Sequence, residues 1–194
     1  MTRIAITGAA GRMGRILIEA VDAVEDAQVG AAIVLPSDPM VGVDAGAIAG
    51  LGKNLNVVAV TDVAAAVDSF DVLIDFTAPE ATLAFAALAA QARAVHVIGT
   101  TGLSDADIAK LAPAARHAVI VRAGNMSLGV NLLMGLTKRV AAALDEAFDI
   151  EVVEANENMM RPQDVASSII HCLGTDPNYL PVDLEIRPLR PKGK

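Results

Sequence analysis

The chain has 194 residues with a formal net charge of −8, and 54% of its residues are hydrophobic although only 3% are aromatic. The acidic balance argues against a nucleic-acid partner or an anionic membrane surface, both of which need a basic face. No apolar run reaches the roughly 20 residues of a membrane span, and the start of the chain lacks a signal-peptide pattern. The single Cys172 excludes an internal disulfide, so a cytoplasmic protein is expected.

Apolar runs of strand length alternate with segments of helical period along the whole chain. Strands are predicted at 3–7, 28–34, 56–61, 71–77, 94–100, 117–125 and 149–155. Helices are predicted at 11–24, 62–67, 79–93, 104–116 and 127–148, with a Gly/Pro/Asp-rich loop before the strand at 56–61. The strands are near-continuous Val/Ile runs, as in a parallel sheet covered by helices on both faces. The pattern therefore predicts an α/β fold, a doubly wound parallel sheet in three layers that forms one domain over residues 1–194.

Two helix starts carry the spacing of a capping box. Thr77 stands three residues before Glu80, and Ser104 stands three residues before Asp107. Pro79 falls in a first helical turn, where proline is tolerated. Both helices are therefore predicted to begin at these residues.

The segment ITGAAGRMGR, residues 6–15, places Gly8, Gly11 and Gly14 three residues apart between the first strand and the first helix. Glycines in this context let the backbone approach a pyrophosphate, whose charge is attracted by free N–H groups and the helix dipole. The segment therefore predicts a dinucleotide site. The alternative is a glycine turn that serves only helix–strand packing.

The ribose end of such a site is less clearly marked. NAD-binding proteins carry an acidic residue at the end of the second strand, and NADP-binding ones carry a nearby arginine. Val34 and Leu35 occupy these places here, and neither side chain forms a hydrogen bond or an ion pair. Arg12 could take part of the phosphate role, so the choice between NAD and NADP stays open.

Three further stretches, DFTAPEAT (75–82), VIGTTGLS (97–104) and AGNMSLGVN (123–131), join the glycine loop. In this order they resemble dihydrodipicolinate reductase, the nicotinamide-dependent reductase of lysine biosynthesis, over about residues 1–155. The resemblance implies a Rossmann domain whose cofactor phosphates are held near Gly8 by Gly11, Arg12 and Met13. It also implies that the rest of the cofactor contacts residues of three later loops, namely Phe76, Thr77, Gly99, Thr100, Thr101, Ala123, Asn125 and Met126.

The stretch EVVEANENMMRPQDV, residues 151–165, departs from that family. There, E-x-x-EA is followed by a His-His motif, a lysine and a D-A-P-S-G-T run that supply the proton donor and grip a dicarboxylate substrate. This chain has Asn156 and Glu157 in place of the histidines and Met160 near the place of the lysine. No catalytic residue is therefore predicted. The remaining residues are predicted to form one helix (161–174) and one strand (181–189), without a separate substrate domain.

This closing segment, residues 156–194, resembles the last helix and strand of short-chain dehydrogenases. It lacks the Tyr-x-x-x-Lys of that family, because the chain has only Tyr179 and no lysine follows at that spacing. The sequence indicates a chimera of engineered origin, with a natural fusion or a frame-disrupted gene as the alternatives. A monomer or a weak homodimer is expected.

His96, His117 and His171 are too scattered for a metal cluster, so no metal site is predicted and all three are taken as structural. Three functions compete. The first is binding of NAD or NADP without turnover. The second is a working reductase that recruits another acid, such as His171 or Glu154. The third is a scaffold without a specific ligand.

Overall fold

The computed structural model describes residues 1–143, and the chain divides into two compact units, Met1–Arg122 and Ala123–Lys194, which are treated separately below. The predicted strands at 149–155 and 181–189 and the predicted helix at 161–174 lie outside the described residues. Within the described part, no helix combines the length and the apolar composition needed to cross a membrane.

The first unit is built on a six-stranded sheet in the order β3-β2-β1-β4-β5-β6, and every neighbouring pair is parallel. Its strands are β1 (Thr2–Thr7), β2 (Ala27–Ile33), β3 (Ala59–Val60), β4 (Val72–Asp75), β5 (Val95–Ile98) and β6 (Val119–Arg122). The chain runs outward from β1 to β3 and then returns to start β4 on the other side of β1. This reversal between β1 and β4 is the switch point at which doubly wound sheets bind ligands. The predicted doubly wound parallel fold is confirmed.

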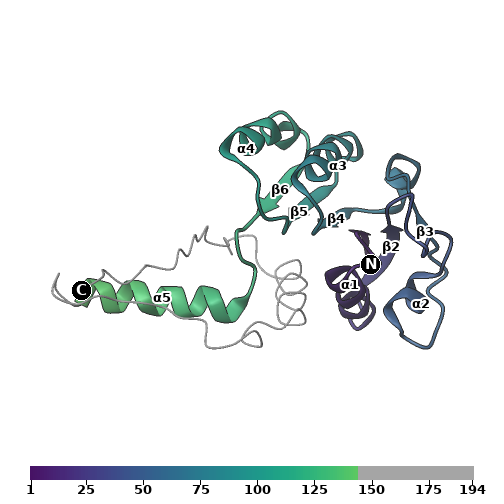
Figure 1. Ribbon diagram of the computed structural model, residues 1–194, viewed down its shortest axis with the longest axis horizontal. Coiled ribbons are helices and arrows are strands. Elements are labelled where there is room, and N and C mark those ends of the chain that lie inside the picture. The colour runs from purple at the N-terminus through teal and green to yellow at the C-terminus, as the bar shows by residue number, and fades with distance from the viewer. Residues whose placement is uncertain (144–194) are drawn as a thin grey trace. The chain divides into compact units, whose positions relative to one another are not determined.

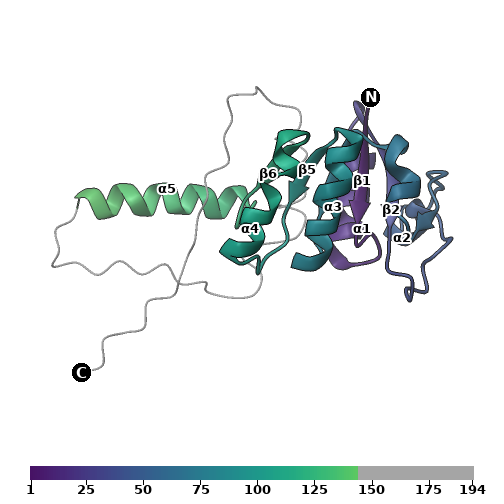
Figure 2. The same ribbon diagram turned by 90° about the horizontal axis from the view of Figure 1, so that it is seen from above.

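Helices cover both faces of the sheet (Figure 1). The helical elements are α1 (Arg12–Asp22), α2 (Ala45–Ala49), α3 (Pro79–Ala92), α4 (Asp105–Leu111) and the 3₁₀ turns η1 (Ala64–Ser69) and η2 (Ala114–Arg116). Helix α1 packs against α2, whereas α3 packs against α4 and both 3₁₀ turns; α3 and α4 lie side by side in Figure 2. The result is the predicted three-layer arrangement.

The central strands are buried on both faces, which explains their unbroken apolar sequence. Ala5 and Leu73 belong to a core cluster against which Phe85 and Leu88 of α3 pack. Ile4, next to Ala5 in β1, is also fully buried, and successive strand residues point to opposite faces. A strand of this kind has no polar face to show in its sequence.

Three predicted elements differ from the structure. The Gly/Pro/Asp-rich loop contains the short helix α2, whose N-cap Asp44 accepts a hydrogen bond from the N–H of Gly46. The helix predicted at 62–67 is the 3₁₀ turn η1. The helix predicted at 104–116 ends at Leu111 and is followed by η2, because Pro113 has no N–H with which to continue the α-helix.

One of the two predicted capping boxes is wrong. At α4, Ser104 and Asp107 form the box as predicted. At α3, the N-cap is Ala78, which makes no side-chain cap. The Thr77 side chain is instead turned towards the carboxylate of Asp75, to which its hydroxyl donates at 2.5 Å, and the helix begins one residue later, after Ala78.

In the second unit the described part contains helix α5 (Leu128–Ala143), which matches the start of the helix predicted at 127–148. Ser127 accepts a hydrogen bond from the N–H of Val130 through its hydroxyl at 3.4 Å. The predicted residues 144–148 lie outside the described part of the chain.

The third glycine of the loop is needed for the packing of α1 on β1. A Cβ at Gly14 would lie 2.3 Å from the carbonyl oxygen of Gly8 and 2.6 Å from Cα of Ala9. We therefore expect Gly14→Ala to destabilise the fold by about 2–3 kcal/mol, measured by urea unfolding, because the clash is with backbone that side-chain rotation cannot relieve. Gly135→Ala in α5 is the control: no described atom lies within 4 Å of its new Cβ, and the change should not destabilise. Equal stability of the two variants would contradict the packing role of Gly14.

Candidate functional site

The loop between β1 and α1 leaves a helix end open to an anion. Gly8 has a φ of +63°, a backbone conformation that favours glycine, and its carbonyl accepts the N–H of Gly11 at 2.9 Å. Gly11 is the N-cap of α1, is exposed, and makes no side-chain cap; no acidic residue lies in the first turn. The N–H groups at the start of α1 therefore have no side-chain partner in the described structure, and the helix dipole adds partial positive charge there.

Two contacts hold this loop in place. The N–H of Ala9 donates to the carbonyl of Ile33 at the end of β2, at 3.0 Å, and Arg15 Nε donates to the carbonyl of Ala10 at 2.9 Å. Arg12 is exposed at the first position of the helix, and Met13 is half-buried beside it. The loop is therefore anchored from both of its flanks while Gly11 and Arg12 face solvent.

The loop after β4 lies next to both the glycine loop and the loop after β5. A Cβ at Gly8 would be 3.4 Å from the methyl of Thr77, and a Cβ at Gly99 would be 2.2 Å from the ring of Phe76. The N–H of Gly99 also donates to the carbonyl of Asp75 at 2.8 Å. These predicted site residues thus gather at the carboxyl edge of the sheet, around the switch point.

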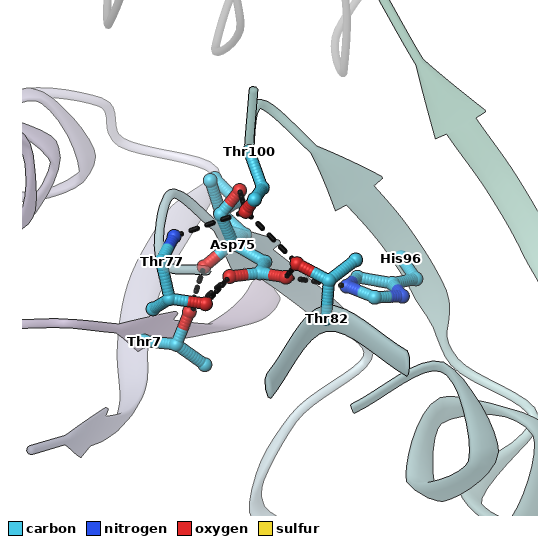
Figure 3. Close-up of polar contacts among 7 residues, drawn as sticks. Thr7, Asp75, Thr77, Thr82, His96 and Thr100 are labelled. Carbon is cyan, nitrogen blue, oxygen red and sulfur yellow. Dashed lines mark hydrogen bonds and ion pairs between the residues drawn. The ribbon is translucent and has the colours of Figure 1, made fainter. Parts of the chain in front are cut away.

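A buried carboxylate connects the strand ends at this edge (Figure 3). Asp75, the last residue of β4, is fully buried, and its Oδ1 accepts from the hydroxyls of Thr7 at 3.1 Å and Thr77 at 2.5 Å. Its Oδ2 accepts from the hydroxyl of Thr82 in α3 at 2.6 Å. Thr100 follows β5, lies 2.9 Å from the Thr82 hydroxyl, and accepts the N–H of Thr77 at 3.0 Å. We call these five residues the Asp75 cluster.

His96 of β5 lies beside this cluster. It is fully buried, and its Nε2 is 3.5 Å from Oδ2 of Asp75, which is longer than an ordinary hydrogen bond. Neither ring nitrogen has a hydrogen-bond partner within the described structure. Burial by itself raises the pKa of Asp75, but the interactions with His96, Thr77 and Thr82 outweigh it and hold that pKa below its usual value.

Further predicted cofactor residues are placed as follows. Thr100 is buried in the Asp75 cluster, whereas Thr101 is exposed. Ala123, Asn125 and Met126 lie in the second unit, where Asn125 Oδ1 accepts the N–H of Ser127 at 2.8 Å and its carbonyl accepts Asn131 Nδ2 at 3.1 Å. The predicted contact of these three residues with a nicotinamide stays a prediction.

The two apolar residues after β2 are not equivalent. Val34 is buried and its N–H donates to the carbonyl of Val60 at 2.9 Å, so it belongs to the sheet. Leu35 is 71% exposed. Of the two positions, only Leu35 presents its side chain to solvent.

Thr7, Thr82 and Asp75 are not among the predicted site residues, although Asp75 and Thr82 belong to the motif DFTAPEAT. Two of them could have been found from the sequence, because a polar residue ends each of two buried apolar strands: Thr7 follows RIAI and Asp75 follows VLI. His96 is fully buried inside β5, as a structural histidine would be. No three His, Cys, Asp or Glu side chains within residues 1–143 are grouped as metal ligands.

The fold and this edge define a class: a Rossmann-like α/β domain with a glycine loop at the switch point of its parallel sheet. Residues 2–126 match the family described as "Dihydrodipicolinate reductase, N-terminus", and the chain belongs to this family.

Among curated relatives, the chain is 57% identical over 155 residues to 4-hydroxy-tetrahydrodipicolinate reductase of Ruegeria pomeroyi, covering 80% of this chain and 57% of the relative. It is 58% identical over 156 residues to the enzyme of the same name from Cereibacter sphaeroides, covering 80% and 58%. The chain thus spans somewhat more than half the length of these relatives.

A solved structure of dipicolinate-bound dihydrodipicolinate reductase from Paenisporosarcina sp. TG-14 is similar with a TM-score of 0.57 and 25% identity, covering 73% of this chain and 54% of that one. The WlbA dehydrogenase from Thermus thermophilus, solved with NAD and alpha-ketoglutarate, has a TM-score of 0.56 at 20% identity, covering 73% and 47%. The second likeness shows the fold alone.

The lowered pKa of Asp75 predicts a pH dependence of stability. Ionised Asp75 stabilises the fold above the pKa of a free aspartate, about 4, and this contribution is lost as the pH falls through the lower pKa of the folded state. We expect Asp75→Asn to cost about 2–3 kcal/mol at pH 7, and this difference from the original chain to shrink as the pH falls below 4. Urea unfolding at a series of pH values measures it.

Other acidic groups titrate in the same range. Asp71 and Asp107 both have a pKa of about 2, but they are present in both proteins, so the difference isolates Asp75. A difference that is constant from pH 7 to pH 3 would contradict the ionised state of Asp75.

Proposed function

We propose that this chain binds a nicotinamide dinucleotide, NADP or NAD, at the carboxyl edge of its sheet. The observation that supports this proposal is the open N-terminus of α1, where Gly11 is exposed and has no side-chain cap, at the same edge of the sheet as the loops that follow β4 and β5. Membership of the reductase family supports the same conclusion. In this proposal Gly8, Gly11, Arg12 and Met13 surround the diphosphate.

The remaining contacts follow the family resemblance. Phe76, Thr77, Gly99, Thr100 and Thr101 line the path from the diphosphate towards the nicotinamide, which Ala123, Asn125 and Met126 contact. The packing of Phe76 on Gly99 and of Thr77 on Gly8 supports the first part of this path. A monomer or weak homodimer in the cytoplasm stays the expectation for the whole chain.

We further propose that the chain binds the dinucleotide without reducing a dihydrodipicolinate-type substrate. The support is in the letters after the E-x-x-EA motif, where Asn156 and Glu157 replace two histidines. Hydride transfer to an imine needs an acid with a near-neutral pKa, and an anionic substrate needs cationic partners. An active reductase, the alternative, would need another acid such as His171 or Glu154.

The closing segment, residues 156–194, differs from the reductase family. We propose that they derive from a short-chain dehydrogenase and that the chain is a chimera, engineered rather than natural. The support is the pattern M-x-R-P-x-D-V-A, followed by a helical segment and D-L-E-I-R-P-L. Protection of amides in 164–173 and 183–187 from hydrogen exchange tests whether these residues form the helix and strand of that family; fast exchange in both segments would contradict it.

The binding proposal is tested by titrating NADPH and NADH against the full chain and following the nicotinamide fluorescence. We expect saturable binding that Gly11→Glu weakens at least about tenfold, because a carboxylate at the helix N-terminus repels the diphosphate. Gly11→Ala is the matched control: its Cβ would lie 3.1 Å from the carbonyl of Gly8, but it adds no charge, so it should weaken binding less.

Absence of binding up to millimolar dinucleotide would favour the third function, a scaffold without a specific ligand. The apolar Val34 and Leu35 support this alternative, because neither side chain can form a hydrogen bond or an ion pair with the ribose end of a dinucleotide. Oxidation of NADPH that depends on the dihydrodipicolinate-type substrate would contradict the proposed inactivity and leave the binding proposal intact.

The exposed Leu35 predicts how the coenzyme preference can be changed. We expect Leu35→Arg to tighten NADPH about tenfold relative to NADH, because a guanidinium at the end of β2 pairs with the 2′-phosphate. Leu35→Gln, which adds polarity without charge, is the control and should shift the ratio little. An unchanged ratio in Leu35→Arg, measured by the same titration, would place the ribose elsewhere.

A further inference from the structure

The direction of each hydrogen bond in the Asp75 cluster follows from counting protons. A threonine hydroxyl has one proton to donate, whereas an ionised carboxylate only accepts. The Thr82 hydroxyl lies 2.6 Å from Oδ2 of Asp75 and 2.9 Å from the Thr100 hydroxyl. Its single proton goes to the carboxylate, so in the contact with Thr100 the Thr82 oxygen accepts; the Thr100 hydroxyl also lies 3.5 Å from the carbonyl of Asp75, a longer and weaker contact.

The same count fixes the other end of this chain. The Thr100 oxygen has two lone pairs in addition to its proton, and it accepts the backbone N–H of Thr77 at 3.0 Å. The order is therefore Thr77 N–H to Thr100, Thr100 to Thr82, and Thr82 to Asp75, as the dashed lines of Figure 3 allow the reader to follow.

Thr77 is thereby left without a proton to offer. Its backbone N–H is used by Thr100, and its hydroxyl proton is used by Oδ1 of Asp75 at 2.5 Å. The side chain is only half-buried, and its methyl lies next to Gly8 of the glycine loop. What Thr77 presents to a ligand in this place is the lone pairs of its hydroxyl oxygen.

We propose that Asp75 is a positioning residue that makes Thr77 a hydrogen-bond acceptor only, so that Thr77 receives an O–H or N–H donor of the dinucleotide and not a phosphate oxygen. The donor is a ribose hydroxyl, the adenine amine or the carboxamide amine, the groups of the ligand that carry such protons. Phosphate oxygens are acceptors and would face the lone pairs of Thr77, which separates the diphosphate at α1 from the part of the ligand beside Thr77. This inference rests on the proposed dinucleotide binding.

The test compares two identical substitutions within the cluster, using the full chain and the fluorescence titration with NADPH. Thr77→Val removes the acceptor, and we expect about tenfold weaker binding. Thr82→Val removes a donor to the same carboxylate but leaves the Thr77 hydroxyl in place, so we expect a change of at most about twofold. Thr77→Ser keeps the hydroxyl and should restore binding to within about twofold of the original chain.

Asp75 is tested by a second matched pair. Asp75→Asn puts an amide donor into the cluster and is expected to weaken NADPH about tenfold. Asp71→Asn makes the same substitution immediately before β4, at the opposite edge of the sheet, where the side chain pairs with Arg3 at 2.6 Å, and should leave binding unchanged. Thermal unfolding reports whether each variant is folded; if Asp75→Asn is not, the comparison of Thr77→Val with Thr82→Val decides.

Displacement of NADPH by ADP-ribose, which has no nicotinamide, narrows the choice of donor. An equal loss of affinity for ADP-ribose and NADPH in Thr77→Val assigns a group that both ligands carry, a ribose hydroxyl or the adenine amine, and a loss for NADPH alone assigns the carboxamide. Thr77→Val that binds NADPH as the original chain does, or Thr82→Val that weakens it as much as Thr77→Val, would overturn the inference while dinucleotide binding stands. An original chain that binds no dinucleotide would overturn both.

Discussion

The buried carboxylate of Asp75 constrains the whole ligand-binding edge of the sheet. A charge with no exposed surface is tolerated only where hydrogen bonds replace its water, and here three threonine hydroxyls do so. These donors come from the end of β1, the loop after β4 and helix α3, while Thr100 adds the end of β5. Satisfying one charge therefore fixes four chain segments relative to each other.

The same edge of the sheet also contains a helix end whose N–H groups have no side-chain partner in the described structure. The first turn of α1 has neither a side-chain cap nor an acidic residue, although Ser104 and Asp107 supply both at α4. A helix without an N-terminal cap is less stable than the same helix with a capping side chain. An anionic ligand that binds beside the Asp75 cluster would accept hydrogen bonds from the free N–H groups of this helix end and so offset the loss of stability.

Sequence predicted the sheet and its order of elements because burial on both faces leaves long Val/Ile runs, and predicted the glycine loop because backbone geometry demands those residues. The sequence did not predict the helix starts that depend on hydrogen bonds between side chains and distant parts of the chain. Thr77 had the spacing of a helix cap, but its side chain is turned towards the carboxylate of Asp75, and Ala78 is the N-cap. Helix α2 was missed because its five residues are held by Asp44, which accepts the N–H groups of Gly46, Leu55 and Val57 across a loop.

The Asp75 cluster shows why a motif can locate a site without giving the hydrogen-bond polarity of its residues. The letters D-F-T place Thr77 among the predicted cofactor contacts, but they do not say whether its hydroxyl donates or accepts, since a hydroxyl can do both. Only the distances reveal that the aspartate of the same motif and Thr100, twenty-three positions later, consume both protons of Thr77. The polarity of a hydroxyl is a property of its network, so it follows from the tertiary contacts that the fold creates and not from local sequence.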